Sequence, residues 1–231
     1  QVKQFLNLLK KKDDMVAVPT DKTNSITMMD TKDYCTLVNK HLTKDAAPIS
    51  NDKMHSIHKE ALSLVEEYAD ILSTGEYNYI KSTIKKKSIP TVKLLSKDHK
   101  DKKEDGNYPT RLVVPAKNFT AGFPNVGYRG IRDILDRNKI NYTRKTIIQA
   151  SDLKVKLEGL DINNKEHTIV SMDIEVMYPS VSFKMVAKAV EFFLRDCPEE
   201  DKILAQSCLD MIKFGMGNTL ITFEGKYWEY G

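Results

Sequence analysis

The residues best suited to chemistry lie in one segment of the second half of the chain, from His167 to Val181. The segment opens with apolar residues that predict a β-strand, and Asp173 stands where this apolar run ends. Tyr178 follows, and Pro179 opposes further strand pairing because it has no backbone N–H to donate. A carboxylate at a strand end suits Mg²⁺, which prefers hard oxygen ligands and is often shared between carboxylates and substrate phosphates. The alternative interpretation is a strand with an exposed aspartate before a turn.

A second set of residues suited to chemistry is a run of lysines in the first half of the chain. Nine lysines lie from Lys81 to Lys103, against two aspartates. Within this run a strand is predicted at residues 91–95, and a turn at 105–107 leads to a returning strand at 110–115. The pattern predicts a hairpin that carries cations and binds the phosphates of nucleic acid or nucleotides. A plain solvated surface is the alternative.

The composition bounds the class of protein. The 231 residues are 41% apolar and 29% charged, which is enough for one large domain or two small ones. No apolar run approaches the roughly 20 residues that span a bilayer, so no membrane partner is expected. Three cysteines, odd in number and without metal-ligand spacing, indicate reduced thiols in an intracellular protein, nuclear or cytoplasmic. The sequence begins with Gln1 and shows no signal peptide, so we expect a piece of a longer protein.

Hydrophobic periodicity predicts the elements that must position these residues. Helices are predicted at residues 2–12, 31–43, 51–73, 76–86, 126–138, 145–158, 183–196 and 199–214. Alternating patterns around turns predict two further hairpins, residues 15–29 and 219–230, whereas residues 46–50 are interpreted as a linker. His55 and His58 lie on one of the helices and are interpreted as surface or core residues, because a metal site needs further ligands.

Five segments, read in order, are similar to the motifs of one family. Residues 18–27 (VPTDKTNSIT) are similar to I-P-A-D-K-G-G-A-T, and residues 90–100 (PTVKLLSKDHK) to P-x-x-Y-G-L-P-K-x-H-K. Residues 109–114 (PTRLVV) are similar to P-x-R-P-I-V, and residues 171–181 (SMDIEVMYPSV) to S-F-D-V-x-x-L-Y-T-N-I. Residues 223–229 resemble the strand pair before an A-M-G-S-P loop. The order of these motifs resembles that of reverse transcriptases of the Penelope-like retroelement type.

The sequence departs from this family at several positions. Leu94 and Ser96 stand where the family has Gly and Pro, Leu112 replaces a usual Pro, and Met172 stands where Phe is common. The sequence also stops at Gly231, before the family's Gly-rich loop and the Tyr-x-Asp-Asp box that supplies the second metal-binding carboxylate. We therefore expect this segment alone to be inactive and to need, as a partner, the remainder of the polymerase that follows Gly231.

The resemblance implies an α+β fold of the right-hand polymerase type. Residues 1–150 would form helix-rich fingers that include the basic hairpin at 90–115. Residues 151–231 would form the first part of an antiparallel palm sheet that carries the Asp173 motif, truncated before the remaining palm motifs. The strand with Asp173 is expected to neighbour the hairpin at 219–230 or to share a sheet edge with it.

The implied activity is that of an RNA-directed DNA polymerase, a nucleotidyltransferase that binds an RNA or DNA template-primer and deoxynucleoside triphosphates. Two Mg²⁺ ions would clamp the attacking and leaving oxygens of the phosphoryl transfer in the complete enzyme. Asp173 would bridge both ions, the Ile174 carbonyl would contact the ion that holds the triphosphate, and Glu175 is a less favoured ligand. Tyr178 would lie under the incoming sugar and exclude a 2′-hydroxyl; an ordinary core aromatic residue is the alternative.

The basic hairpin would serve the same reaction. Arg111 would clamp the triphosphate through paired hydrogen bonds, and Lys100 would act on it as a point charge. Lys97 is the alternative residue for the lysine role. Seven further lysines would follow the backbone of the nucleic acid. They are Lys22, Lys85, Lys86, Lys87, Lys93, Lys102 and Lys103.

Two other functions fit parts of the pattern. DNA polymerases of the α-type, or family B, carry D-x-x-S-L-Y-P-S-I, whose end resembles the segment from Met177 to Val181. That family has much longer regions upstream, so it ranks second. A nucleic-acid-binding module with a vestigial palm would need the lysines but not Asp173. The sequence after Gly231 separates an enzyme from such a module, because an Asp-Asp pair between apolar residues would indicate an enzyme.

Overall fold

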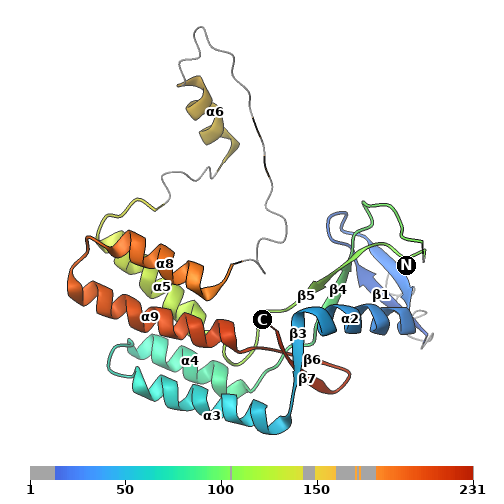
Figure 1. Ribbon diagram of the computed structural model, residues 1–231, viewed down its shortest axis with the longest axis horizontal. Helices are drawn as coiled ribbons and strands as arrows, with labels where there is room; N and C mark the ends of the chain where they lie inside the picture. Colours follow the sequence, from blue (N-terminus) through green and yellow to red (C-terminus); the bar gives the residue numbers. More distant parts are fainter. Residues whose placement is uncertain are drawn as a thin grey trace. The chain divides into compact units, whose positions relative to one another are not determined.

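The computed structural model describes residues 14–104, 106–142, 149–159, 170, 172 and 181–230. These residues form helices and small antiparallel sheets, so the predicted α+β class is confirmed (Figure 1). The protein divides into two compact units. The first unit comprises Gln1–Val126 and Met211–Gly231, and the second comprises Gly127–Asp210. The predicted division into fingers at 1–150 and palm at 151–231 stays a prediction.

The first unit contains the predicted N-terminal hairpin. β1 (Met15–Pro19) pairs with β2 (Ile26–Asp30) in antiparallel register. The turn between them contains Asn24 at a φ of 53°, a left-handed conformation that asparagine tolerates better than most residues. Val18 and Met29 are buried, so the hairpin presents one face to the core.

The C-terminal hairpin of the first unit is also found as predicted. β6 (Thr219–Phe223) and β7 (Lys226–Tyr230) are joined by Glu224 and Gly225, which have φ values of 47° and 73°. Two successive residues with positive φ match the right-handed twist of paired strands, which favours a tight two-residue connection. The hairpin is therefore explained by its local sequence.

The predicted linker at residues 46–50 is instead a strand. β3 (Ala46–Ile49) pairs with β7 and forms the edge of a sheet with the order β3-β7-β6. The prediction was wrong because this segment has little local strand signal, and the strand depends on a long-range pairing. Pro48 is tolerated there because an edge strand leaves one side without ladder hydrogen bonds.

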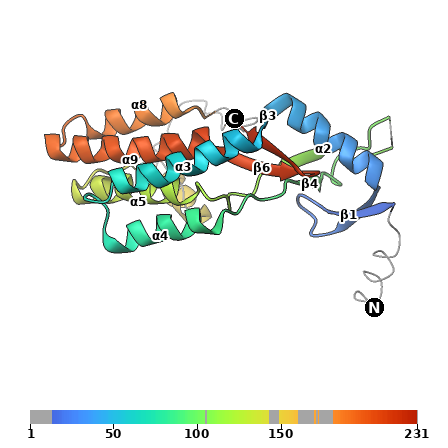
Figure 2. The ribbon, with the colours of Figure 1, turned by 90° about the horizontal axis from the view of Figure 1, so that it is seen from below.

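The basic segment forms the predicted hairpin, in which β4 (Lys93–Ser96) pairs with β5 (Thr110–Val113). β4 joins the other two sheets at its two ends. Just before β4, Thr91 forms a parallel bridge with Thr222 of β6. Figure 2 shows β4 and β6 next to each other. At the end of β4, Ser96 forms a parallel bridge with Thr20, directly after β1. β4 is thus the connection through which the three sheets support one another.

One core lies between these strands and α2 (Thr31–Asp45), which Figure 1 shows beside β1, β4 and β5. α2 begins where Asp30 caps it, because the Asp30 carboxylate accepts a hydrogen bond from the Lys32 backbone N–H at 2.7 Å. The buried members of the core are Val18, Met29, Val38, Leu42, Val92, Leu94, Ile221, Phe223 and Trp228. Strand alternation buries Leu94 and leaves Lys93 exposed, so the Lys93 cation faces solvent.

α3 (Asn51–Glu67) and α4 (Thr74–Lys86) lie side by side in the first unit (Figure 1). The helix predicted at 51–73 is shorter than expected because Ser73 starts the next helix, where it forms a capping box with Glu76. His58 Nε2 lies 3.2 Å from a backbone carbonyl of α4 and is partly buried. The interpretation of His58 as a packed residue is therefore confirmed.

The second unit is built from helices. Its elements are α6 (Ala150–Glu158), α8 (Phe183–Leu194) and the parts of α5 (Gly122–Arg137) and α9 (Glu199–Gly217) that lie within 127–210. Asp201 is 7% exposed and links the start of α9 to the end of α5. It accepts hydrogen bonds from Arg137 and, at 2.6 Å, from Asn138 Nδ2. Among the helices of the described ranges, none has the length and apolar character needed to span a membrane.

Candidate phosphate-binding surface

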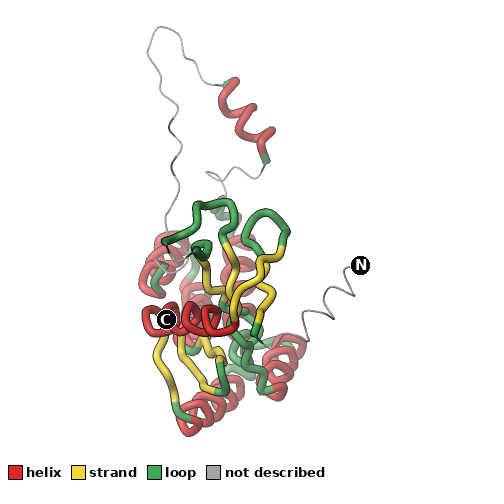
Figure 3. Tube along the Cα trace, turned by 90° about the vertical axis from the view of Figure 1, so that its right-hand side faces the viewer, coloured by secondary structure: helices red, strands yellow, loops and turns green. Residues whose placement is uncertain are grey.

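The turn after β1 and the loop between β4 and β5 lie side by side at one end of the strands; Figure 3 draws both in green. The Asp21 backbone N–H donates to the Ser96 carbonyl at 2.8 Å and extends the bridge between the two segments. The Thr23 hydroxyl donates to the Asp98 carboxylate, although these residues are 75 positions apart. The two segments therefore form one surface. We call it the twin-loop surface, residues 20–25, 93–104 and 106–111.

The turn at residues 20–25 is held by its own polar groups. The Ser25 N–H donates to Thr20 Oγ1 at 2.8 Å, and the Thr20 N–H donates to the Ser25 carbonyl at 3.1 Å. Thr23 Oγ1 lies 2.9 Å from Thr20 Oγ1 and 3.0 Å from Ser25 Oγ. This closed network fixes the turn, and the predicted nucleic-acid contact Lys22 is exposed on it.

The loop between β4 and β5 is ordered by backbone hydrogen bonds. The Lys97 N–H donates to the Pro109 carbonyl at 2.8 Å and so continues the ladder beyond β4. The Lys100 N–H donates to the Lys97 carbonyl at 2.9 Å, and the Lys103 N–H donates to the Asn107 carbonyl at 2.9 Å. Three of the predicted cationic residues are thus placed by fixed backbone rather than by a free tail.

An ion pair holds Arg111 in position on this surface. Its Nη1 lies 3.3 Å from Asp21 Oδ1. The Arg111 side chain is 56% exposed, whereas the Asp21 side chain is only 8% exposed. A carboxylate with so little exposure needs a partner, because an unpaired buried charge is costly. One contact uses only part of the five N–H donors of a guanidinium, so the others can bind phosphate oxygens.

Three of the predicted cations share the outer face of the β4–β5 hairpin. Leu95 is the register partner of Arg111, so these two side chains lie on one face. Lys93 and Lys97 stand two positions before and after Leu95, and strand alternation puts them on the same face. Lys100 lies further along the loop and is exposed. The structure therefore groups both candidates for the lysine role with Arg111 in the twin-loop surface.

Lys102 and Lys103 are exposed in the same loop, which lies near α2. His41 of α2 has its Nε2 3.2 Å from Thr110 Oγ1. Burial lowers the pKa of His41; Asp45 acts in the opposite direction, and the positive charge of Lys103 lowers the pKa further. His41 was missed by sequence reasoning, although its place beside the buried Leu42 and Val38 of α2 is a signal for such a contact.

Lys85, Lys86 and Lys87 lie at the C-terminal end of α4, where all three are exposed. Lys87 is the C-cap, with a φ of 48°, and positive charge at this end suits the helix dipole. Within the described ranges, no hydrogen bond or ion pair joins these three lysines to the twin-loop surface. Their predicted role in binding nucleic acid therefore has a structural alternative, which is helix capping.

Four residues of the predicted catalytic segment lie outside those that the structure describes, namely Asp173, Ile174, Glu175 and Tyr178. Val170 and Met172 are described, belong to no strand, and are 68% and 88% exposed. The predicted strand is thus not found at these two positions. Over the described part of the protein, no group of three or more His, Cys, Asp or Glu side chains is arranged to hold a metal ion.

Sequence reasoning missed the acidic residues of the twin-loop surface. Asp21 is the ion-pair partner of Arg111, but the two are 90 positions apart and no local pattern connects them. Asp98 uses one oxygen to accept from Thr23. Its Oδ1 and the Ser96 hydroxyl are buried, and neither has a hydrogen-bond partner among the residues that the structure describes. Buried polar atoms of this kind usually bind water or a ligand.

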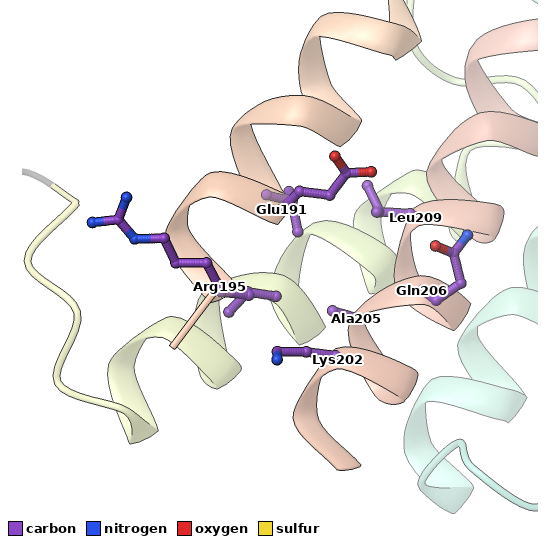
Figure 4. Close-up of a pocket in the computed structure, with 8 residues that line it drawn as sticks. Glu191, Arg195, Lys202, Ala205, Gln206 and Leu209 are labelled. Carbon is purple, nitrogen blue, oxygen red and sulfur yellow. The ribbon is translucent and has the colours of Figure 1, made fainter. Parts of the chain in front are cut away.

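A hollow of about 200 Å³ lies between α8 and α9 in the second unit and contains none of the predicted site residues (Figure 4). Its lining residues are Val190, Glu191, Leu194, Arg195, Lys202, Ala205, Gln206 and Leu209. In Figure 4 the charged groups of Glu191 and Arg195 point to different sides rather than toward one point. Catalysis needs polar groups that converge, so we assign no chemistry to this hollow.

A scan against protein-family models found none that matches, and searches of curated proteins and of solved structures found no match either.

Proposed function

We propose that the protein is the fingers and first palm segment of an RNA-directed DNA polymerase that resembles Penelope-like reverse transcriptases. The twin-loop surface would bind the triphosphate of the incoming deoxynucleotide and the nearby template backbone. One observation carries the proposal. Residues 18–27, which are similar to one family motif, meet in this surface the hairpin that carries two others, residues 90–100 and 109–114, although they lie far from that hairpin in the sequence. Motifs that serve one reaction are expected to converge in this way.

The cations of the twin-loop surface would bind different parts of the ligand. Arg111 gives directional hydrogen bonds to phosphate oxygens, and Asp21 holds its guanidinium beside the turn before the nucleotide arrives. Lys100 would add a point charge from the loop, and Lys97, on the same face as Arg111, is the alternative. Lys22 and Lys93 would neutralise backbone phosphates of the template. Each neutralised phosphate releases counterions, so binding weakens as salt rises.

The catalytic part of the proposal concerns Asp173 and Ile174, which would hold Mg²⁺ by the family motif. When bound, the metal supplies charge stabilisation for the attacking and leaving oxygens. Tyr178 would select the deoxyribose sugar. All three residues lie outside the described ranges, so we assign no geometry to them. Among the described residues, those of the twin-loop surface would bind and orient the triphosphate.

The proposed architecture is a right-hand polymerase. Fingers at residues 1–150 would contain the basic hairpin at 90–115, and residues 151–231 would begin the palm. An α-type DNA polymerase would use Asp173 in the same way, and it is separated from a reverse transcriptase by its use of DNA templates rather than RNA templates.

The test is primer extension by the protein at its full natural length. Arg111→Ala should raise the KM for deoxynucleotide about 10- to 100-fold, the equivalent of a charge-assisted hydrogen bond. Asp173→Asn should abolish extension. Lys59→Ala, which removes an exposed charge from α3, is the matched control and should leave KM unchanged. An unchanged KM in Arg111→Ala would refute the assignment of the surface.

Residues 1–231 alone give a second test. They should bind template-primer in a salt-dependent manner and should not extend the primer, because they lack the Tyr-x-Asp-Asp box. Extension by these residues alone would contradict the proposal. Tight binding by the native protein without any extension on RNA or DNA would instead support a nucleic-acid-binding module.

A further inference from the structure

The solvent-facing side of α5 in the second unit carries an aromatic residue that is followed by two arginines. Tyr128 is 61% exposed, and the next residue, Arg129, is exposed as well. The Arg132 guanidinium carbon lies 6.0 Å from the centre of the Tyr128 ring, one helical turn further on. This distance is the outer limit of a cation–π contact, so Arg132 covers the ring only loosely.

The end of α5 adds a second tyrosine to this side. The backbone leaves the helix through Lys139, whose φ is 55°, with hydrogen bonds from the Lys139 N–H to the Asp136 carbonyl and from the Ile140 N–H to the Leu135 carbonyl. This pair of bonds is a Schellman motif, which reverses the backbone direction after a helix. Tyr142 follows two residues after Ile140 and is half-buried. The helix end therefore places Tyr142 back against the helix that precedes it.

The groups that shift the pKa of Tyr142 are those that lie close to its hydroxyl. Burial raises this pKa, and the negative charge of Asp136 together with its hydrogen bond to the Tyr142 hydroxyl raises it further. Arg132 acts on the same hydroxyl in the opposite direction, and Tyr128 is close enough to contribute. Tyr128, Arg132 and Asp136 are spaced four residues apart, so with Tyr142 the four side chains form one stripe.

The buried residues of α5 explain why this stripe is not needed for folding. Ile131, Ile134 and Leu135 are buried, and they supply the contacts that hold the helix in the second unit. A single exposed tyrosine is ordinary on a protein surface. Two tyrosines with two arginines around them are a different feature, because the set combines flat stacking surfaces with positive charge.

The charges on and after α5 indicate the kind of partner that this side would bind. Residues 128–142 include four cations and two anions, which are Arg129, Arg132, Arg137 and Lys139 against Asp133 and Asp136. Arg137 is paired with Asp201, whereas Asp136 keeps its negative charge when it accepts a hydrogen bond from the Tyr142 hydroxyl. Arg129, Arg132 and Lys139 therefore remain against Asp133 and Asp136. Single-stranded nucleic acid combines backbone phosphates with unstacked bases, and proteins that bind it pair aromatic side chains with nearby arginines.

We infer that this stripe together with the adjacent Arg129 is a binding site for single-stranded nucleic acid, and we call the set the α5 stripe (Tyr128, Arg129, Arg132, Asp136 and Tyr142). A base stacks on the open Tyr128 ring, while Arg129 and Arg132 contact neighbouring phosphates. Tyr142, held by Asp136, limits the site at the end of the helix. The inference goes beyond the twin-loop surface and does not require polymerase activity.

The test measures binding of the 231-residue protein to a fluorescein-labelled 20-nucleotide oligo(dT) and to an abasic strand of the same length. The wild type should bind oligo(dT) more tightly, because only that strand can stack. Tyr128→Ala should weaken oligo(dT) binding about tenfold and remove this difference, and Tyr128→Phe should retain it. Arg129→Ala with Arg132→Ala should weaken binding to both strands and make it less sensitive to salt.

Several outcomes would overturn the inference. One is unchanged oligo(dT) binding in Tyr128→Ala, and another is an equal loss on the abasic strand. Binding of poly-glutamate as tight as that of oligo(dT), and equally weakened by Tyr128→Ala, would show a site for acidic proteins instead. Tyr128 is 61% exposed, so its replacement should leave the folded structure intact, which circular dichroism checks.

The same assay separates this inference from the proposed function. Arg111→Ala changes the twin-loop surface and should leave the difference between oligo(dT) and the abasic strand in place. If Arg111→Ala impairs deoxynucleotide use while Tyr128→Ala changes nothing, only the α5 stripe is refuted. If Tyr128→Ala abolishes the base-dependent difference while Arg111→Ala leaves KM unchanged, only the polymerase assignment of the twin-loop surface is refuted.

Discussion

The pairing of Asp21 with Arg111 allows a quantitative test of the twin-loop surface. Asp21→Asn keeps the shape of the side chain and an acceptor oxygen but removes the negative charge. Arg111→Gln removes the positive charge in the same way. The double-mutant cycle built from these variants isolates the interaction of the two charges from the other effects of each substitution.

The magnitude follows from the geometry. Two unit charges 3.3 Å apart interact by about 1.3 kcal/mol at the dielectric constant of water. The Arg111 side chain is 56% exposed, so solvent screens the pair, and holding a long side chain in one place costs entropy. We therefore expect a coupling free energy of about 0.5–1 kcal/mol in dilute salt. It should fall by at least half in about 1 M NaCl, where the Debye length is about 3 Å.

The assay is urea denaturation of the wild type, the two single variants and the double variant, each in dilute salt and in about 1 M NaCl. The matched control is the exposed pair of Arg195 and Asp196, which are adjacent in sequence and should show a smaller coupling. A coupling near zero in dilute salt would mean that the turn after β1 does not hold Arg111. A coupling that does not respond to concentrated salt would contradict the exposed geometry.

Two further predictions test other parts of the structure. Because burial lowers the pKa of His41 below its usual 6.5, the unfolded protein takes up a proton first, so stability should fall as pH drops below about 6.5. His41→Gln should flatten this dependence between about pH 7.5 and 5.5 in urea titrations; an identical slope would exclude His41 as its source. Gly130→Ala should destabilise the second unit by about 1–3 kcal/mol, because a Cβ at this position would lie 2.5 Å from Cys208 Sγ. Gly75→Ala is its control and should be neutral or stabilising, since nothing lies within 4 Å; equal losses at both glycines would refute the packing argument.

The elements predicted from the sequence are those that depend on neighbouring residues. The hairpins at 15–29 and 219–230 and the cap at Asp30 follow from alternation, turn residues and capping chemistry within a few positions. The pairing of the basic segment was likewise predicted from its alternating strands. Local physics therefore accounted for the elements and for the presence of cations on the β4–β5 hairpin.

The features that were missed depend on distant parts of the sequence. β3 is a strand because β7 pairs with it, and nothing in its own residues favours a strand over a linker. Asp21 meets Arg111 because the bridge between Thr20 and Ser96 brings two hairpins together. A pattern within either hairpin contains no information about the other. The role of Asp173 remains a prediction from the motif, because the residue lies outside those that the structure describes.

The bridging position of β4 has a consequence for synthesis of the protein. The core that covers β4 includes Ile221, Phe223 and Trp228, and β3 has no ladder partner other than β7 among the described residues. When the ribosome has made only the first half of the sequence, these apolar surfaces have nothing to cover them. The core of the first unit can therefore be completed only after residues 219–230 have been synthesised. Until then, the nascent polypeptide exposes apolar surface that chaperones can bind.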